Sequence, residues 1–286
     1  MCQFSENKDK KNRKMKFRPC IDLHAGQVKQ IVGSTLKDNA STTTNIKKEI
    51  DPSTNFVSDK PASAYAEMYL RDSLPGGHVI MLGPGNTEPA TLALKTYPQG
   101  LQIGGGINDT NAKEWIEKGA SHVIVTSFVF KNGQVHWDRL KKLVEIVGKD
   151  KLVLDLSCRR KPKNESNESD EYFVVTDRWQ NYTDVPVNEV TLKDLSQYCD
   201  EFLVHGVENE GKRCGILEDL VVLLGKHSSI PVTYAGGVKD LSDLDRVNEL
   251  GKGKVDLTIG SALVRQTCQN FTNSFIQYLY HVSQLF

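Results

Sequence analysis

The sequence lacks three features that would each point to a class of function. Its six cysteines include no CxxC pair, which excludes the common zinc and dithiol motifs and favours a reducing compartment with free thiols. No apolar run approaches the roughly 18 residues that a membrane-spanning helix needs. The formal net charge is +0 at pH 7, so nothing in the bulk charge favours nucleic acid or a membrane surface. We therefore expect no nucleic-acid partner, no membrane partner and no metal site.

The N-terminal segment has neither an apolar core nor the composition of a targeting sequence. Acidic residues stand beside its lysines, which suits neither a signal peptide nor a typical transit peptide. We expect residues 1–15 to be a disordered tail and the protein to be cytoplasmic, with a plastid form whose leader has been removed as the alternative. The remaining composition is that of a globular protein, and we assign residues 16–286 to a single domain.

Short apolar runs alternate with helical patterns along this domain. Eight strands that alternate with helices imply a parallel sheet, and eight such units in about 270 residues fit a closed (β/α)8 barrel better than an open sheet. The first strand runs into Asp22, and the others are expected at 78–82, 101–103, 121–125, 152–156, 201–204, 231–234 and 255–259. Helices are expected at 63–72, 88–96, 109–118 (with Asp109 as N-cap), 137–147, 189–198, 216–225, 242–250 and 269–285.

Two polar insertions interrupt the alternation. Residues 33–59 are too long and too polar for an ordinary connection. Residues 157–187 contain a charged run and then EYFVVTDRW, which predicts a short hairpin arm over the mouth of the barrel. We expect both segments to close over a bound ligand.

Landmarks of the chain recur in the same order after about 130 residues. Asp22 and Asp155 each end an apolar strand, the glycine turns IGGGI and YAGGV follow, and a small polar pair ends the next strand in each copy. We interpret the barrel as two duplicated half-barrels, at about 16–148 and 149–270.

The paired aspartates are the candidate catalytic residues. A carboxylate at the carboxyl end of a buried strand lies where (β/α)8 enzymes place their catalytic groups. Two carboxylates act as general base and general acid when their environments separate their pKa values. The competing interpretation is that each aspartate only caps a turn.

The glycine turns are candidate phosphate cradles. Glycine lets backbone amides approach an anion closely, and a following helix N-terminus adds favourable partial charge. Two such turns predict a substrate with a phosphate at each end, although glycines there could also serve only as tight turns. The predicted cradle residues are Gly104, Gly105, Gly106, Thr126 and Ser127 in the first half and Gly236, Gly237, Gly260 and Ser261 in the second.

Four further side chains are candidates for substrate contact. His205 ends the strand EFLVH and could line the pocket, although a lone histidine is more often structural. Trp179 lies on the predicted arm, where it could stack on a flat heterocycle or simply pack. Arg159 and Arg160 follow Asp155 closely, with solvated charge as the alternative for at least one of them.

Several of these motifs together carry a family resemblance. FRPCIDLHAGQVKQIVG, LQIGGGI, LVLDLS, TDRW, FLVHGVENEGKRCGI and LTIGSAL resemble the phosphoribosylformimino-aminoimidazole carboxamide ribotide isomerases of histidine biosynthesis in their eukaryotic form. The resemblance spans roughly residues 16–265. It implies a duplicated (β/α)8 barrel, a bisphosphorylated substrate, no cofactor and an Amadori rearrangement of an aminoaldose to an aminoketose; we expect a monomer.

The same resemblance assigns roles to the aspartates. Asp22 falls on the position of the family's general base, which removes the C2 proton, and Asp155 on that of the general acid, which protonates the ribose ring oxygen. Bacterial relatives carry a threonine where this chain has Gly206, so the part played by that hydroxyl must be taken by a neighbour or be dispensable.

Two other functions compete with the isomerase. The sister cyclase of the same pathway shares both aspartates and both cradles, but its first strand continues with a lysine where this chain reads DLHAG. A non-catalytic barrel that binds sugar phosphates as a sensor is the alternative from another class, and the presence of both aspartates argues against it.

Overall fold

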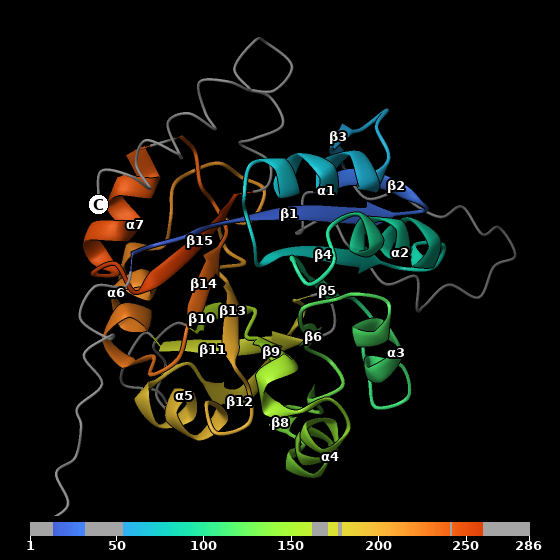
Figure 1. Cartoon of the computed structure of the whole chain (residues 1–286). Helices are drawn as coiled ribbons and strands as arrows, with labels where there is room; N and C mark the ends of the chain where they lie inside the picture. Colours follow the sequence, from blue (N-terminus) through green and yellow to red (C-terminus); the bar gives the residue numbers. More distant parts are fainter. Residues whose placement is uncertain (1–13, 32–53, 162–170, 177–178, 241, 260–286) are drawn as a thin grey trace, which may run out of the picture.

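Eight parallel strands form a closed barrel in the computed structural model, which describes residues 14–31, 54–161, 171–176, 179–240 and 242–259 (Figure 1). The barrel closes where the first strand pairs with the last, Phe17 standing opposite Leu257. This confirms the predicted (β/α)8 fold. In barrel order the strands are β1 (Phe17–His24), β4 (Gly77–Leu82), β5 (Leu101–Gly104), β6 (Val123–Val125), β9 (Leu152–Asp155), β13 (Glu201–His205), β14 (Val232–Ala235) and β15 (Val255–Ile259).

Helices follow the barrel strands and surround the barrel (Figure 1). The predicted bounds of two helices are confirmed, and the others shift by a few residues. The helices are α1 (Ala62–Arg71), α2 (Thr87–Thr96), α3 (Ala112–Glu117), α4 (Trp137–Val147), α5 (Glu189–Leu195), α6 (Glu218–His227) and α7 (Ser242–Leu250), with a short 3-10 turn η3 (Lys149–Lys151). The helix predicted at 269–285 lies outside the described residues, as do residues 1–13.

The prediction that Asp109 caps the third helix is wrong. That helix begins at Ala112, and its N-cap residue Asn111 makes no side-chain capping bond. The side chain of Asn108 instead accepts hydrogen bonds from the amide and hydroxyl of Thr110, which forms a turn before the helix. Asp109 is left to pair with Lys142 of α4.

Three small antiparallel additions decorate the carboxyl ends of the barrel strands. β2 (Gln27–Ile31) and β3 (Thr54–Val57) extend β1, and β7 (Phe130–Lys131) pairs with β8 (Gln134–Val135). The predicted hairpin arm is a three-stranded sheet of β10 (Cys158–Lys161), β11 (Glu171–Thr176) and β12 (Asn181–Pro186). The sequence did not predict β10 (CRRK) as a strand, because three of its four residues are cationic and resemble the polar run that follows.

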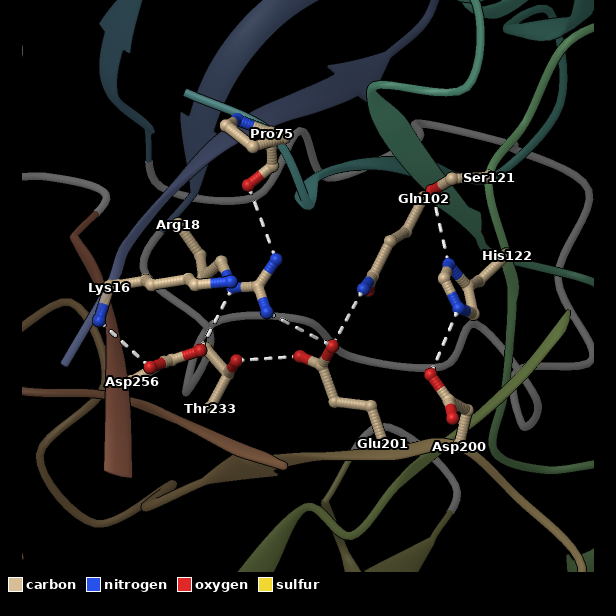
Figure 2. Close-up of polar contacts among 10 residues, drawn as sticks. All are labelled: Lys16, Arg18, Pro75, Gln102, Ser121, His122, Asp200, Glu201, Thr233 and Asp256. Atoms are coloured by element: carbon tan, nitrogen blue, oxygen red, sulfur yellow. Dashed lines mark hydrogen bonds and ion pairs between the residues drawn. The ribbon is translucent and has the colours of Figure 1, made fainter. Parts of the chain in front are cut away.

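Alternate residues of each strand fill the barrel in layers, because side chains on a strand alternate between its two faces. The layer at the amino ends is polar (Figure 2). Arg18 donates to Asp256 at 3.1 Å and to Glu201 at 3.4 Å, and Glu201 also accepts from Gln102 and Thr233. Above it lies a small apolar cluster of Ile80, Ile124, Val153, Leu203 and Ala235. The third layer, at the carboxyl ends, contains the candidate site.

None of the helices in the described ranges is long and apolar enough to cross a bilayer.

Candidate active site

Asp22 and Asp155 lie on opposite sides of the barrel mouth. Asp22 is near the carboxyl end of β1, and Asp155 is the last residue of β9. β9 is the fourth strand from β1 in either direction around the closed sheet of eight. The layered packing thus places the two carboxylates on opposite strands of the barrel.

A cavity of about 50 Å³ lies beside Asp22, on the side of the barrel formed by β13, β14, β15, β1 and β4. Its walls come from β1, β4, β13, β14 and β15 and from the loops that follow β13 and β14. The lining residues are Cys20, Asp22, His78, His205, Glu210, Gly211, Ala235, Gly236, Gly237, Val238 and Thr258.

Asp22 is a carboxyl group whose pKa is close to neutral. Burial disfavours its charged form, and the nearby carboxylate of Glu210 adds repulsion; together they raise the pKa of Asp22 to about 7 against the attraction of His205. At neutral pH about half of such a group is ionised, which is the poise that a general base requires.

Asp155 is held as a carboxylate by three hydrogen-bond donors. Its Oδ1 accepts from Ser157 Oγ at 3.0 Å and lies 3.1 Å from His205 Nδ1, while its Oδ2 accepts from Thr126 Oγ1 at 3.1 Å. Burial alone would raise the pKa of Asp155, but the charge of His205 and these bonds outweigh it, so the pKa lies below its ordinary value. The two aspartates therefore have separated pKa values, in opposite directions from the ordinary one.

His205 is the cation of this layer. Burial would lower its pKa, but the charge and hydrogen bond of Asp155, with weaker contributions from Glu210 and Asp22, raise the pKa of His205 to about 9. The ring of Trp179 lies 6.4 Å from that of His205, at an interplanar angle of 35°. The three-stranded arm thus brings its tryptophan to the barrel mouth, where the sequence predicted it.

The glycine turns approach neighbouring backbone too closely for any side chain. Gly105 has φ +93°, and a Cβ there would lie 2.1 Å from the carbonyl oxygen of Met81. Gly237 has φ +75°, and a Cβ there would lie 2.2 Å from the carbonyl oxygen of Gly215. Both positions thus require glycine for conformational and for steric reasons. Gly237 and its neighbour Gly236 also line the cavity.

The surroundings of the predicted cradles differ from expectation in two respects. The helices α3 and α7 begin at Ala112 and Ser242, several residues beyond the glycines, so neither helix N-terminus directly follows its turn. The hydroxyl of Thr126 donates to Asp155. Of the predicted pair Thr126 and Ser127, the exposed Ser127 is therefore the one whose hydroxyl can donate to a bound anion. Gly260 and Ser261 lie outside the described residues.

The two arginines after Asp155 have different surroundings. Arg160 is engaged by Asp219 at the start of α6 and by the hydroxyl of Tyr172, and its amide donates to Glu208. These contacts fasten β10 to the loop after β13. Arg159 is half-buried, and its guanidinium lies 5.9 Å from the ring centroid of Tyr182. Of the two, Arg159 remains the candidate for substrate contact.

Two ionisable residues of the cavity, Glu210 and His78, were not predicted from the sequence. Glu210 stands in the charged run VENEGKRC, where it resembles a solvated loop residue. Burial raises its pKa, partly offset by His205. His78 is the second residue of β4 and lines the cavity. Burial, and to a lesser extent repulsion from His205, lower the pKa of His78 to about 3, so it is neutral. The alternation of β4 could have revealed His78; no local pattern marked Glu210.

The cysteine of the cavity is not activated as a nucleophile. Cys20 lines the cavity, but burial and the charge of Asp22 raise the pKa of its thiol well above the usual value, so the reactive thiolate form is disfavoured. Within the described ranges no three His, Cys, Asp or Glu side chains are grouped as metal ligands would be.

Known proteins resemble this chain over most of its length. The model of the family described as "Histidine biosynthesis protein" matches residues 16–269. A chloroplastic protein of Medicago truncatula is 56% identical over 253 residues, covering 87% of this chain and 77% of that protein. Proteins of Neurospora crassa and Saccharomyces cerevisiae are 52% and 47% identical, and in each case the match covers 87% of this chain and 91% of the relative. All three are named 1-(5-phosphoribosyl)-5-((5-phosphoribosylamino)methylideneamino)imidazole-4-carboxamide isomerases.

Proposed function

This chain belongs to the histidine biosynthesis protein family, and from that premise we infer that it catalyses the isomerisation for which its relatives are named. It is an enzyme of the aldose–ketose isomerase type, acting on a small phosphorylated substrate. The observation that carries this conclusion is the identity of 47–56% to isomerases across 87% of the chain. The barrel and its paired carboxylates support it.

The substrate that fits is bisphosphorylated. The relatives' name contains two phosphoribosyl groups, and the two glycine turns lie after β5 and after β14, on different sides of the barrel mouth. We assign one phosphate to the turn at Gly104–Gly106 with Ser127, and the other to the turn at Gly236–Gly237 with Gly260 and Ser261. Exposed amides of glycine turns bind phosphate without a metal ion.

Asp22 is assigned as the general base. Ring opening of the aminoaldose gives a Schiff base, and removal of its C2 proton gives an enolamine that tautomerises to the aminoketose. A carboxyl group with a pKa of about 7 accepts that proton at neutral pH, and its strand places it on one wall of the cavity. Asp155, on the opposite strand, is assigned as the general acid that protonates the ribose ring oxygen.

The arm supplies the contacts outside the barrel. Trp179 covers the aminoimidazole by stacking, and Arg159, from β10 of the same three-stranded sheet, contacts the substrate. We propose a monomeric enzyme that requires no cofactor, because every step is a proton transfer. We also propose a cytoplasmic location; the plant relative, whose name includes "chloroplastic", keeps a plastid location as the alternative.

The test is a steady-state assay of the purified protein with the bis(phosphoribosyl) aminoaldose. We expect turnover, and we expect Asp22→Asn and Asp155→Asn each to lower kcat by roughly 10²–10⁴-fold with substrate binding retained, because general acid–base groups contribute about that much. Unchanged turnover in both variants would refute the acid–base assignment. Turnover of the cyclase substrate with ammonia, and none of the aminoaldose, would refute the isomerase.

A further inference from the structure

The turn after β14 holds three consecutive amides that lack acceptors. Gly236, Gly237 and Val238 are buried and line the cavity, and within the described residues none of their N–H groups donates a hydrogen bond. Buried amides in native proteins almost always have an acceptor. Successive N–H groups in a turn with positive φ, here +120° at Gly236 and +75° at Gly237, form a concave site for an anion.

These amides are neutral, and no formal charge adjoins them along the chain in a free state. The helix α7 begins at Ser242, so its N-terminus does not directly follow the turn. Lys239 comes soon after the turn, but it is exposed and its charge acts on Glu218 and Asp240. Because charged donors bind a phosphate about twice as strongly as neutral ones, the turn calls for a cation from another segment.

The loop after β13 packs directly on this turn. The amide of Gly215 donates to the carbonyl oxygen of Gly237 at 2.8 Å, and the side chain of Asn209 closes the loop by donating to the carbonyl oxygen of Gly215 at 2.7 Å. A Cβ built on Gly215 would meet no atom within 4 Å, so there is open space beside it. Gly211 of the same loop lines the cavity. The residues between Gly211 and Gly215 therefore run next to the anion site.

Arg213 lies between these two glycines and has a donor without an acceptor. Its Nε is buried, and within the part of the chain that the structure describes Arg213 makes no hydrogen bond and no ion pair. A buried charged donor left unsatisfied is costly. The backbone of Arg213 is also in the left-handed region, at φ +55°. Such strain in a residue other than glycine is concentrated at functional sites, and both observations point to a ligand for this side chain.

The acids of the loop are engaged elsewhere. Glu208 accepts a hydrogen bond from the amide of Arg160 at 2.7 Å. Glu210 lines the cavity, where its charge acts on Asp22. Neither carboxylate pairs with Arg213 among the described residues, so the guanidinium is available to an external anion.

We propose that Arg213 binds the substrate phosphate held by the turn at Gly236–Gly237 and is the side chain that selects for a phosphate at that end of the substrate. This inference rests on the proposed isomerase function and deepens it by giving one of the two phosphates a cationic partner. The turn amides fix the position of the phosphate, and the planar guanidinium adds charge and two parallel donors.

The experiment compares replacements of two neighbouring cations in the full-length protein. Arg213→Met keeps an apolar stem but loses the charge and the donors. We expect it to raise KM for the aminoaldose by roughly 10–100-fold and to change kcat by no more than about twofold, because a contact made equally in the ground and transition states affects KM alone. Arg213→Lys keeps the charge without the planar fork and should give an intermediate KM. Lys212→Met is the matched control: Lys212 is exposed in the same loop, and its KM should equal that of the wild type.

Inorganic phosphate gives a readout that needs no turnover. In titration calorimetry, Arg213→Met should bind phosphate more weakly than the wild type and Lys212→Met do. KM should also rise less steeply with ionic strength in Arg213→Met, because the screened charge is gone. In a Gly237→Ala background, Arg213→Met should raise KM by a smaller factor than it does in the wild type, because both changes act on one phosphate.

Unchanged KM and phosphate affinity in Arg213→Met would overturn the proposal while leaving the isomerase intact, and so would equal losses in Arg213→Met and Lys212→Met. Circular dichroism checks that each variant folds; Arg213→Gln replaces Arg213→Met in the same comparison if the latter does not. A wild-type protein that binds phosphate through Arg213 but does not turn over the aminoaldose would overturn the proposed function and leave the phosphate contact standing.

Discussion

Replacing Arg18 by Met should destabilise the barrel more than any surface ion-pair change. Arg18 is 8% exposed, and its guanidinium donates to Asp256, to Glu201 and, at 3.2 Å, to the carbonyl oxygen of Pro75 (Figure 2). Met fills much of the same volume but removes the guanidinium that pairs with the buried carboxylates of Asp256 and Glu201. Breaking a buried pair in this way costs about 3–5 kcal/mol, and at about 2–4 °C per kcal/mol it lowers Tm by roughly 10 °C.

The assay is urea unfolding followed by circular dichroism, together with the thermal midpoint. Arg246→Met is the matched control. Arg246 also bonds two carboxylates, Glu218 at 2.7 Å and Glu249 at 2.9 Å, but its side chain is 39% exposed. Such exposed pairs contribute little to stability, because water screens their charges. A loss for Arg18→Met no larger than for Arg246→Met would refute the argument. Adding Glu201→Gln to Arg18→Met should recover part of the loss, because one buried charge disappears.

Two further predictions concern the cavity. Glu210→Gln removes the like charge that helps raise the pKa of Asp22, so Asp22 should stay ionised to lower pH. The acid limb of the kcat/KM profile should therefore move down from about pH 7 toward the ordinary carboxyl range. An unchanged acid limb would show that Glu210 does not influence the pKa of Asp22. Gly237→Ala places a Cβ against the carbonyl oxygen of Gly215 and should raise KM at least tenfold by displacing the phosphate turn. Gly85→Ala is the control, because Gly85 also has a positive φ (+83°) but has open space around the new Cβ, and its KM should be unchanged. Equal KM values for the two variants would count against the phosphate cradle.

The barrel could be predicted because its signal is repeated and local. Strands buried on both faces read as short apolar runs, and each run reports its own position without knowledge of its neighbours. The same holds for Asp22 and Asp155, which end such runs. The alternation of side chains along β9 and β13 also places Asp155 and His205 on the same face of the sheet, where they can form a pair. These strands are adjacent in the barrel with Leu203 opposite Asp155, and His205 is two residues farther on the same face.

What could not be predicted depends on contacts between segments distant in the sequence. Glu210 acquires its raised pKa from burial against the barrel mouth, and nothing in its polar loop announces that burial. β10 is a strand because β11 pairs with it, despite a sequence that favours solvent. The third helix starts late because Asn108 bonds Thr110 and so competes with the backbone.

The closure of the sheet also constrains how the chain is made. β1 completes its pairing with β15, and the hydroxyl of Thr258 bonds the carbonyl of Arg18 across 240 residues of sequence. At about 5–20 residues per second on the ribosome, the first strand is exposed for tens of seconds before its partner emerges. During that interval Arg18 has no access to Asp256, and one edge of β1 is open to pairing with other chains. Newly made copies should therefore depend on chaperones more than the stability of the finished barrel would suggest.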